Sequence, residues 1–285
     1  MNVLIKEITP KHIITQSKLP GIEYCVNPYT GCSHACVYCY ARFMKRFSNH
    51  NEDWGTFVDI KINAAETCAA DIRKIKPNTT LMFGTVTDCY QPLESKYRLT
   101  RSILEQIAAL PEKPFHVSLL TKSDLILRDI DLLEKIPSVS VGFSVAWHDE
   151  QARKIFDPHC PPIHRRMAAL TTLRNAGVSV FAFIGPILPG ITDLPEIFRM
   201  LNGSVSTIHG ETLNLSCGNL QNVLHAVHQY NPALRTSFEK NIRDAQYWTS
   251  VQREFLKLAG TYGMTIEGFY RHPTERGIVS TLFSV

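Results

Sequence analysis

Residues 27–42 read Asn-Pro-Tyr-Thr-Gly-Cys-Ser-His-Ala-Cys-Val-Tyr-Cys-Tyr-Ala-Arg and place three thiols within eight residues. These are Cys32, Cys36 and Cys39, in a C-x3-C-x2-C spacing. Such a loop can curl three thiolates around one small inorganic cluster, and three ligands to a cluster of four irons leave one iron without a protein ligand. The loop therefore predicts a metal centre with one open position, where a cofactor could bind.

Two other interpretations of the three thiols stay open at this point. A structural zinc site usually needs a fourth ligand, which Cys25 or His34 could supply. The cysteines could also be unligated core residues, although a loop rich in Asn, Pro, Gly, Ser and His is an unusual place for them. The spacing favours the cluster over both alternatives.

Composition limits the class of protein. The chain has 285 residues, 44% of them hydrophobic, which is enough for the core of one large α/β domain. The formal charge is +4, and the Lys and Arg residues are spread along the chain without a dense cationic run. This charge permits nucleic-acid binding but does not indicate it.

The sequence predicts a cytoplasmic protein that does not bind a membrane. Its first residues lack a positively charged lead into an apolar core, and no window approaches the roughly 18 apolar residues of a membrane span. In the cytosol the eight cysteines should stay reduced. Clustered thiols then indicate metal binding or catalysis rather than disulfides.

The rest of the chain alternates short apolar runs with helical patterns, which is typical of strand–helix repeats and a parallel sheet. We expect strands at 22–26, 80–84, 116–120, 139–144, 178–184 and 207–215, and helices at 64–74, 99–110, 127–136, 163–176, 194–201 and 243–259. Six such units are too few for a closed barrel of eight. The predicted fold is a partial (β/α)6 TIM-like open barrel with a C-terminal helical extension. We expect a single domain over 1–285, with a core at about 20–220 and the extension at about 221–285.

In such folds the reactive groups gather at the carboxyl ends of the strands. Chemically informative segments follow the predicted strands at 84–89, 121–123, 144–147, 185–190 and 216–219. These segments should face one mouth of the barrel.

The thiol spacing, with an aromatic residue before the last Cys, resembles that of the radical S-adenosylmethionine enzymes. The wider sequence resembles their spore photoproduct lyase-like branch from about Ile22 to Pro195. The matching segments include Thr-Asp-Cys-Tyr-Gln-Pro-Leu-Glu at 87–94, Leu-Thr-Lys-Ser at 120–123, Phe-Ser-Val at 143–145, Phe-Asp-Pro at 156–158 and Pro-Ile-His-Arg-Arg at 162–166.

The resemblance implies a cluster and a cofactor. Cys32, Cys36 and Cys39 would hold a [4Fe-4S] cluster whose open iron takes the amino and carboxylate groups of S-adenosylmethionine. One electron would then release a 5′-deoxyadenosyl radical, which abstracts a substrate hydrogen. The electron would come from an external donor of the flavodoxin or ferredoxin type, and the protein would contribute position and exclusion of water.

The resemblance also assigns cofactor-binding residues. Lys122, at a strand end, would pair with the methionine carboxylate, although such a lysine can simply be solvated. Ser144 would bind the carboxylate or the ribose, unless its own loop backbone satisfies it. Tyr38 would pack near the adenine, which Gly185 and Pro186 would cradle, although a Gly-Pro turn that ends a strand looks the same.

The chain departs from the lyase at the hydrogen donor. Spore photoproduct lyases carry a donating Cys in the segment that matches residues 85–88, where this chain has Thr85. A hydroxyl is a poor hydrogen-atom donor, so Thr85 counts here only among the cofactor-binding candidates. Cys89 and Cys217 are alternative donors and Tyr40 is a candidate redox relay, but buried thiols and packed tyrosines are the ordinary explanation for such residues.

The sequence leaves the substrate unidentified. The alternatives are repair of UV-damaged DNA by the lyase route, and a zinc-stabilised binding module without catalysis. Residues of the extension could contact a base or a phosphate, although helix packing explains the aromatic ones equally well. These residues are Arg243, Tyr247, Trp248, Arg271 and His272.

Overall fold

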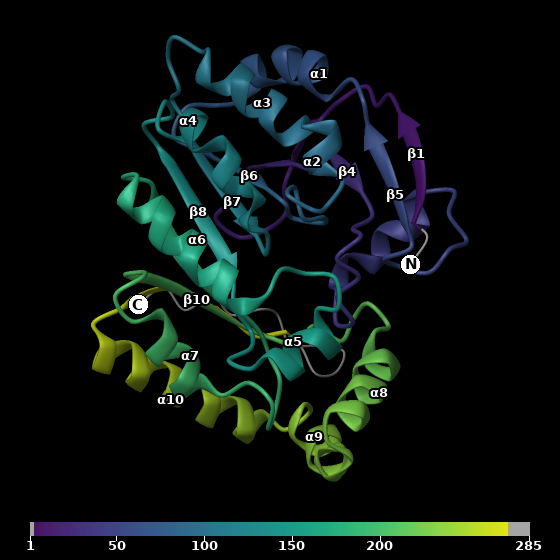
Figure 1. The fold of residues 1–285 in the computed structure, drawn as a ribbon, viewed down its shortest axis with the longest axis vertical. Helices are drawn as coiled ribbons and strands as arrows, with labels where there is room; N and C mark the ends of the chain where they lie inside the picture. Colours follow the sequence, from purple (N-terminus) through teal and green to yellow (C-terminus); the bar gives the residue numbers. More distant parts are fainter. Residues whose placement is uncertain (1–2, 273–285) are drawn as a thin grey trace. The chain divides into compact units, whose positions relative to one another are not determined.

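The computed structural model describes residues 3–272 and divides the chain into two compact units. Unit 1 contains residues 1–35, 41–142 and 172–179, and unit 2 contains residues 36–40, 143–171 and 180–285. The chain passes between the units several times (Figure 1). The expectation of a single domain stays a prediction, and the end of the predicted C-terminal extension, 273–285, lies outside the described residues.

The larger sheet has eight strands in the order β11-β10-β9-β8-β7-β6-β3-β2. Parallel pairs join β3 to β6, β6 to β7, β9 to β10 and β10 to β11, whereas β2 is antiparallel to β3. Within residues 3–272 the order ends at β11 and β2 without closing, which confirms the partial, open TIM-like barrel. The strands are β2 (Ile14–Gln16), β3 (Tyr24–Val26), β6 (Thr80–Phe83), β7 (His116–Thr121), β8 (Val139–Ser144), β9 (Ser179–Ile187), β10 (Thr207–Thr212) and β11 (Thr265–Tyr270).

Unit 1 also contains a small sheet in the order β1-β5-β4. Its strands are β1 (Leu4–Ile8), β4 (Tyr29–Thr30) and β5 (Phe57–Lys61). Helices α1 (Ala64–Asp71) and α3 (Leu99–Ala108) pack against each other and bury apolar side chains such as Ile103 and Leu104. Unit 1 also contains the shorter helices η2 (Ile72–Lys74), α2 (Glu94–Tyr97) and α4 (Ile130–Leu133).

In unit 2, α7 (Leu194–Leu201) and α10 (Ala245–Tyr262) lie side by side (Figure 1). The Phe198 and Phe255 rings meet edge to face at 5.2 Å, and Phe255 also contacts Phe269 of β11. Buried aromatic residues of this size stabilise a core by several kcal/mol each, about 3–5 on truncation to Ala. The other helices of this unit are α5 (Glu150–Phe156), α8 (Leu220–Tyr230), η4 (Pro232–Leu234) and α9 (Arg235–Asn241).

Some of the helices begin at a capping side chain. Asp193 accepts a hydrogen bond from the Glu196 amide at the start of α7, and Asp244 accepts one from the Gln246 amide at the start of α10. Four elements run across the division between the units: η1 (Tyr40–Phe47), α6 (Ile163–Asn175), β8 and β9. The last short helix, η3 (Asp124–Asp129), directly follows the end of β7.

The predicted elements agree with the structure where the apolar pattern was long. The strand at 139–144 and the helix at 194–201 have the predicted bounds, and α6 ends one residue early. The extension is more than helical, because β11 pairs with β10 at one end of the sheet. The prediction also missed β1, β2, β4, β5, α2, α5, α8 and α9.

Among the described residues, no helix combines the length and apolarity that a membrane crossing needs.

Candidate functional site

The first half of the thiol loop lies in unit 1, where two side chains of the 87–94 segment hold it. Gln91, which is fully buried, accepts hydrogen bonds from the Ser33 amide (2.9 Å) and the Ser33 hydroxyl (3.2 Å). The Gly31 carbonyl accepts from Thr87 Oγ1 at 2.6 Å and from Gln91 Nε2 at 3.3 Å. Cys32 is therefore fixed from both sides through its neighbours Gly31 and Ser33.

Gly31 has a backbone that other residues would not adopt. Its φ is +87°, and a Cβ there would meet the Phe57 carbonyl oxygen at 2.3 Å. A side chain at this position would push the loop away from β5, so glycine directly before Cys32 has a structural cause.

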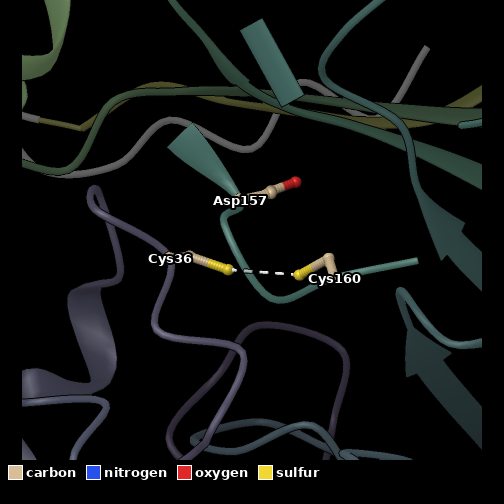
Figure 2. Close-up of side chains that lie close together, drawn as sticks. All are labelled: Cys36, Asp157 and Cys160. Carbon is tan, nitrogen blue, oxygen red and sulfur yellow. Dashed lines mark hydrogen bonds between the residues drawn. The ribbon is translucent and has the colours of Figure 1, made fainter. Parts of the chain in front are cut away.

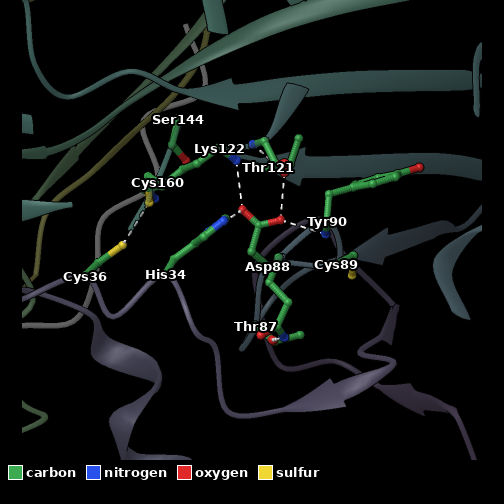
Figure 3. A network of polar contacts seen from close by, with 12 residues as sticks. His34, Cys36, Thr87, Asp88, Cys89, Tyr90, Thr121, Lys122, Ser144 and Cys160 are labelled. Atoms are coloured by element: carbon green, nitrogen blue, oxygen red, sulfur yellow. Dashed lines mark hydrogen bonds and ion pairs between the residues drawn. The ribbon is translucent and has the colours of Figure 1, made fainter. Parts of the chain in front are cut away.

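Asp88 organises a second set of contacts in unit 1 (Figure 3). One oxygen accepts from the Thr121 hydroxyl (2.7 Å) and the Tyr90 amide (2.9 Å). The other accepts from the Lys122 amide (2.8 Å) and lies 3.2 Å from His34 Nδ1. Asp88 thus links the thiol loop residue His34 to the carboxyl end of β7.

This arrangement decides the charge of Asp88. Burial alone would raise the pKa of its carboxyl group, but the charge of nearby His34 and the hydrogen bonds outweigh burial and hold the pKa well below its usual range. Asp88 is therefore a carboxylate at neutral pH, and it acts as an acceptor for every group around it.

The second half of the thiol loop lies in unit 2 and is held at three points. The Val37 amide donates to the Phe156 carbonyl at 2.9 Å, and the Tyr38 hydroxyl donates to Asp157. The Tyr38 carbonyl accepts from Nδ2 of the fully buried Asn219 at 2.7 Å. These contacts fix the residues that lie between Cys36 and Cys39.

Asp157 is fully buried and has partners at both carboxylate oxygens. Oδ1 accepts from Tyr38, and Oδ2 accepts from Trp147 Nε1 (3.0 Å) and from both terminal nitrogens of Arg166 (3.3 Å each). Burial, followed by the charge of Asp157, raises the pKa of Tyr38, so its hydroxyl stays protonated and is the donor. Arg166 supplies the positive charge that a buried carboxylate requires.

Cys36 Sγ lies 3.8 Å from Cys160 Sγ, beside Asp157 (Figure 2). The ligand atoms of these three residues lie within 4.8 Å of one another, close enough to surround a metal ion. The Asp157 oxygens already accept four hydrogen bonds, which leaves them poorly available to a metal ion.

The structure places the predicted cofactor-binding residues as follows. Lys122 is half-buried at the end of β7, with its amide bonded to Asp88, and Thr85 accepts from Asn27 Nδ2 at 2.9 Å. The Ser144 carbonyl accepts from Arg166 at 3.1 Å at the end of β8. Gly185 and Pro186 lie buried in β9, and Tyr38 packs against Trp147 with ring centroids 5.8 Å apart.

The predicted catalytic residues differ in exposure. Cys89 is 1% exposed, and its Sγ lies 3.9 Å from the Val26 carbonyl, inside unit 1. Burial, followed by the charges of Asp88 and Glu94, raises the pKa of the Cys89 thiol well above its usual range. Cys217 is half-buried, with Sγ 4.0 Å from the Cys39 carbonyl in unit 2, and Tyr40 is half-buried at the start of η1.

Three of the five residues suggested for base or phosphate contacts have side-chain partners within the protein. Trp248 is 3% exposed and donates to the Ile242 carbonyl at 3.0 Å. His272 pairs with Glu211 at 2.9 Å, and Arg271 donates to the Ala245 carbonyl at 3.4 Å. Trp248 is therefore a core residue, and helix packing accounts for its position.

Sequence reasoning quoted Gln91 and Asp157 within motifs, and Asn219 within a strand-end segment, but gave none of them a role. Cys160 was also left without one. The available signal was a polar residue within a short motif near a strand end. Gln91, Asp157 and Asn219 bind loop residues that lie 58, 119 and 181 positions away in the sequence, respectively. The spacing of residues in the sequence could not reveal these contacts.

The donor set of the loop fits an iron–sulfur cluster. The chain turns twice along it, through hydrogen bonds from Ala35 N to the Cys32 carbonyl and from Cys39 N to the Cys36 carbonyl. Ala35 has φ +54°, a left-handed conformation that tightens the first turn. Three thiolates without a carboxylate or imidazole among them are the ligands that such clusters take.

These features define a class. The family model of the Radical SAM superfamily matches residues 26–201, more than half of the chain, and the chain belongs to this superfamily.

The chain is also similar to other proteins in sequence and in fold. The chain is 36% identical over 211 residues to an uncharacterized protein of Methanocaldococcus jannaschii, covering 74% of this chain and 78% of that protein. It is 35% identical over 191 residues to an uncharacterized protein of Mycobacterium tuberculosis, of which it spans 55%. Its fold is similar to that of spore photoproduct lyase complexed with dinucleoside spore photoproduct, with a TM-score of 0.70 at 15% identity, over 93% of this chain and 82% of the lyase.

Proposed function

We propose that the protein is a radical SAM enzyme in which Cys32, Cys36 and Cys39 hold a [4Fe-4S] cluster. When bound, the cluster and S-adenosylmethionine would supply a 5′-deoxyadenosyl radical that abstracts hydrogen from an unidentified substrate. Membership of the superfamily supports this proposal, as does a variant of spore photoproduct lyase, similar in fold, with bound AdoMet.

The observation that carries the proposal is the support of the thiol loop. Gln91 and Thr87 hold the residues on either side of Cys32, and Phe156, Asp157 and Asn219 hold the residues between Cys36 and Cys39. Five groups that fix one short loop at residues next to its thiols are expected where those thiols must keep a set geometry.

The remaining cofactor contacts are proposed by position. The Lys122 ammonium group would pair with the methionine carboxylate, and Ser144 would hydrogen-bond the same group or the ribose. Tyr38, Gly185 and Pro186 would surround the adenine. Thr85 would contact the bound cofactor, and it occupies the position where the lyases carry a thiol.

Any hydrogen donor is proposed to be Cys217 rather than Cys89. Cys217 is half-buried and lies beside the Cys39 carbonyl, whereas Cys89 is 1% exposed. A thiol that must meet a substrate radical needs access, and the burial of Cys89 suits a packing role. Tyr40 stays a candidate relay because it directly follows Cys39.

Anaerobic reconstitution with iron and sulfide tests the proposal. The expected product is a brown protein with about four irons per chain, which forms 5′-deoxyadenosine from S-adenosylmethionine and dithionite. Cys32→Ala, Cys36→Ala or Cys39→Ala should each abolish colour and product, whereas Cys25→Ala should keep both. A colourless protein with one zinc per chain, lost in Cys25→Ala, would instead establish the zinc-stabilised binding module.

A second candidate is repair of UV-damaged DNA, favoured by the fold shared with spore photoproduct lyase. Thr85 argues against the lyase route, because a hydroxyl donates hydrogen atoms poorly. The test is irradiated DNA, which should increase formation of 5′-deoxyadenosine and return thymine if the candidate is correct. Turnover that is identical with irradiated and unirradiated DNA would exclude it.

The zinc alternative has less support. Its suggested fourth ligands have other partners, because Cys25 Sγ lies 3.2 Å from the Thr15 hydroxyl and His34 pairs with Asp88. We further propose a cytoplasmic enzyme that takes its electron from a flavodoxin or ferredoxin, since a reducing compartment suits a thiolate-bound cluster.

A further inference from the structure

Tyr38 is the residue whose surroundings set it apart within the thiol loop. It lies between two of the three cysteines, yet its ring belongs to a buried cluster with Trp147 and Phe156, and its hydroxyl reaches Asp157. The loop is therefore anchored by a side chain that penetrates unit 2, in addition to its backbone contacts.

Two hydrogen bonds anchor this part of the loop. Phe156 and Asp157 are consecutive, and they bind consecutive loop residues: Phe156 through its carbonyl to the Val37 amide, and Asp157 through its carboxylate to the Tyr38 hydroxyl. Two bonds between adjacent residues on each side fix orientation as well as distance. These two hydrogen bonds therefore set the direction of the chain from Cys36 to Cys39.

Asp157 is itself held firmly. Arg166, 1% exposed, meets it through two nitrogens and also donates to the Ser144 carbonyl (3.1 Å) and the Pro161 carbonyl (3.2 Å). The same guanidinium group thus connects the loop anchor to the end of β8. Burying a carboxylate and a guanidinium carries a desolvation cost that apolar side chains of similar volume would avoid.

We propose that Asp157 is a positioning residue that acts through Tyr38 to set the geometry of the Cys36–Cys39 segment and, with it, the electronic environment of the metal centre. The inference rests on the proposed function, because it concerns the cluster that the loop would hold. It assigns Asp157 no contact with cofactor or substrate. The proposed route of this effect is the Tyr38 hydroxyl, and a double-mutant cycle tests that route.

The experiment compares Tyr38→Phe, Asp157→Asn and the double variant with wild type after anaerobic reconstitution. The control is Tyr230→Phe, which removes a different Tyr–Asp contact in unit 2, from the Tyr230 hydroxyl to Asp149 at 3.3 Å. The readouts are iron per chain, the midpoint potential of the cluster, its EPR spectrum with and without S-adenosylmethionine, and the melting temperature.

Iron content should stay near wild type in Tyr38→Phe, since the three thiols remain. Its cluster potential and EPR spectrum should shift, and S-adenosylmethionine should bind about 10-fold more weakly, in line with losses of outer-shell partners at metal sites. Asp157→Asn should shift the cluster potential and the EPR spectrum in the same direction as Tyr38→Phe does. In the double variant these shifts should be no larger than in the more affected single variant. The control should match wild type in potential and spectrum.

Three results would overturn the inference: a lower melting temperature with unchanged potential and spectrum, effects that add in the double variant, or an equal shift in the control. If Asp157→Asn fails to fold, Tyr38→Phe still decides, because it keeps the buried ion pair. Failure of the proposed function is separate, since in that case wild type would hold no iron–sulfur cluster at all.

Discussion

Gln91 accepts a hydrogen bond from the Ser33 amide at 2.9 Å, across 58 residues of sequence, and so fixes the residue that follows Cys32. The same side chain donates to the Gly31 carbonyl and to Thr87. One buried amide therefore satisfies both backbone groups that flank the first thiol. This bond and its counterparts in unit 2 provide the basis for several measurements.

Replacing Gln91 with Leu should destabilise the protein and impair cluster assembly. The change removes the acceptor of the buried Ser33 amide and one of the two donors to the Gly31 carbonyl. This loss should lower the free energy of unfolding by about 1–3 kcal/mol. Urea unfolding and iron per chain after reconstitution measure the two effects. The control Gln106→Leu, on the exposed side of α3, should stay within about 0.5 kcal/mol of wild type. Equal stability of both variants would contradict the role of Gln91.

Asp88 should make the stability of the cluster-free protein depend on pH in the acid range. Its folded-state pKa is depressed, so its contribution is present above the unfolded pKa of about 4 and is lost as pH falls below that value. Asp88→Asn should lower stability at neutral pH and flatten the decline between about pH 4 and pH 2. The pH dependence of stability is measured by urea midpoints across this range, and the control is Asp53→Asn at an exposed position. If the stability of Asp88→Asn falls with pH as steeply as that of wild type, Asp88 is not the source of the pH dependence.

Lys122→Gln should weaken binding of S-adenosylmethionine by about 10-fold or more, since a hydrogen bond to a charged partner contributes roughly 1.5–3 kcal/mol. Iron content should not change. Binding is measured by the EPR change on titrating the reconstituted protein. Lys135→Ala, at an exposed position after α4, is the control. Unchanged affinity in Lys122→Gln would remove the lysine from the cofactor site.

The thiols should react with iodoacetamide in the order of their exposure. In the cluster-free protein, Cys25, Cys39 and Cys217 are half-buried and should be modified first, while Cys68 and Cys89 should be protected. Burial raises the pKa of Cys68 to about 12, which further slows its reaction. Peptide mass spectrometry at increasing times gives the order. Early modification of Cys89 would revive it as a candidate hydrogen donor.

Hydrogen peroxide should join Cys36 and Cys160 in the cluster-free protein, because their sulfur atoms lie 3.8 Å apart. The two thiols are oxidised to a disulfide, and one peroxide is reduced to two waters. Non-reducing peptide mapping should detect the linked pair, and Cys160→Ser should abolish it. An intact [4Fe-4S] cluster should protect Cys36. Recovery of Cys36 paired mainly with another cysteine would contradict the prediction.

The sequence predicted the parts of the fold that repeat a local pattern. The strand at 139–144 and the helix at 194–201 carry long apolar periodicities, and both have the expected bounds. Strand β1 was missed because its residues are largely exposed at a sheet edge, and the edge strand β11 has no regular alternation of buried and exposed residues.

The residues of the candidate site were likewise predicted only in part. The three cysteines and the strand-end segments follow from spacing and topology, which a single sequence displays. Gln91, Asp157 and Asn219 act on loop residues 58, 119 and 181 positions away, and such pairings arise only when the chain folds. For Trp248 the sequence left a ligand contact and helix packing open, and its 3% exposure makes it a core residue.

Gly84 ends β6 with φ +84°, and a Cβ there would approach the Leu120 carbonyl to 2.8 Å. The missing methyl group keeps the Thr85 segment close to the strand that leads to Lys122. For an experimenter who wishes to change the reaction, the two neighbouring positions are therefore unequal. Variation at 85 alters a side chain held by Asn27, and Thr85→Cys would introduce a thiol there. Any residue other than glycine at 84 would instead displace the Leu120 carbonyl. A library aimed at new chemistry should vary the threonine and keep the glycine fixed.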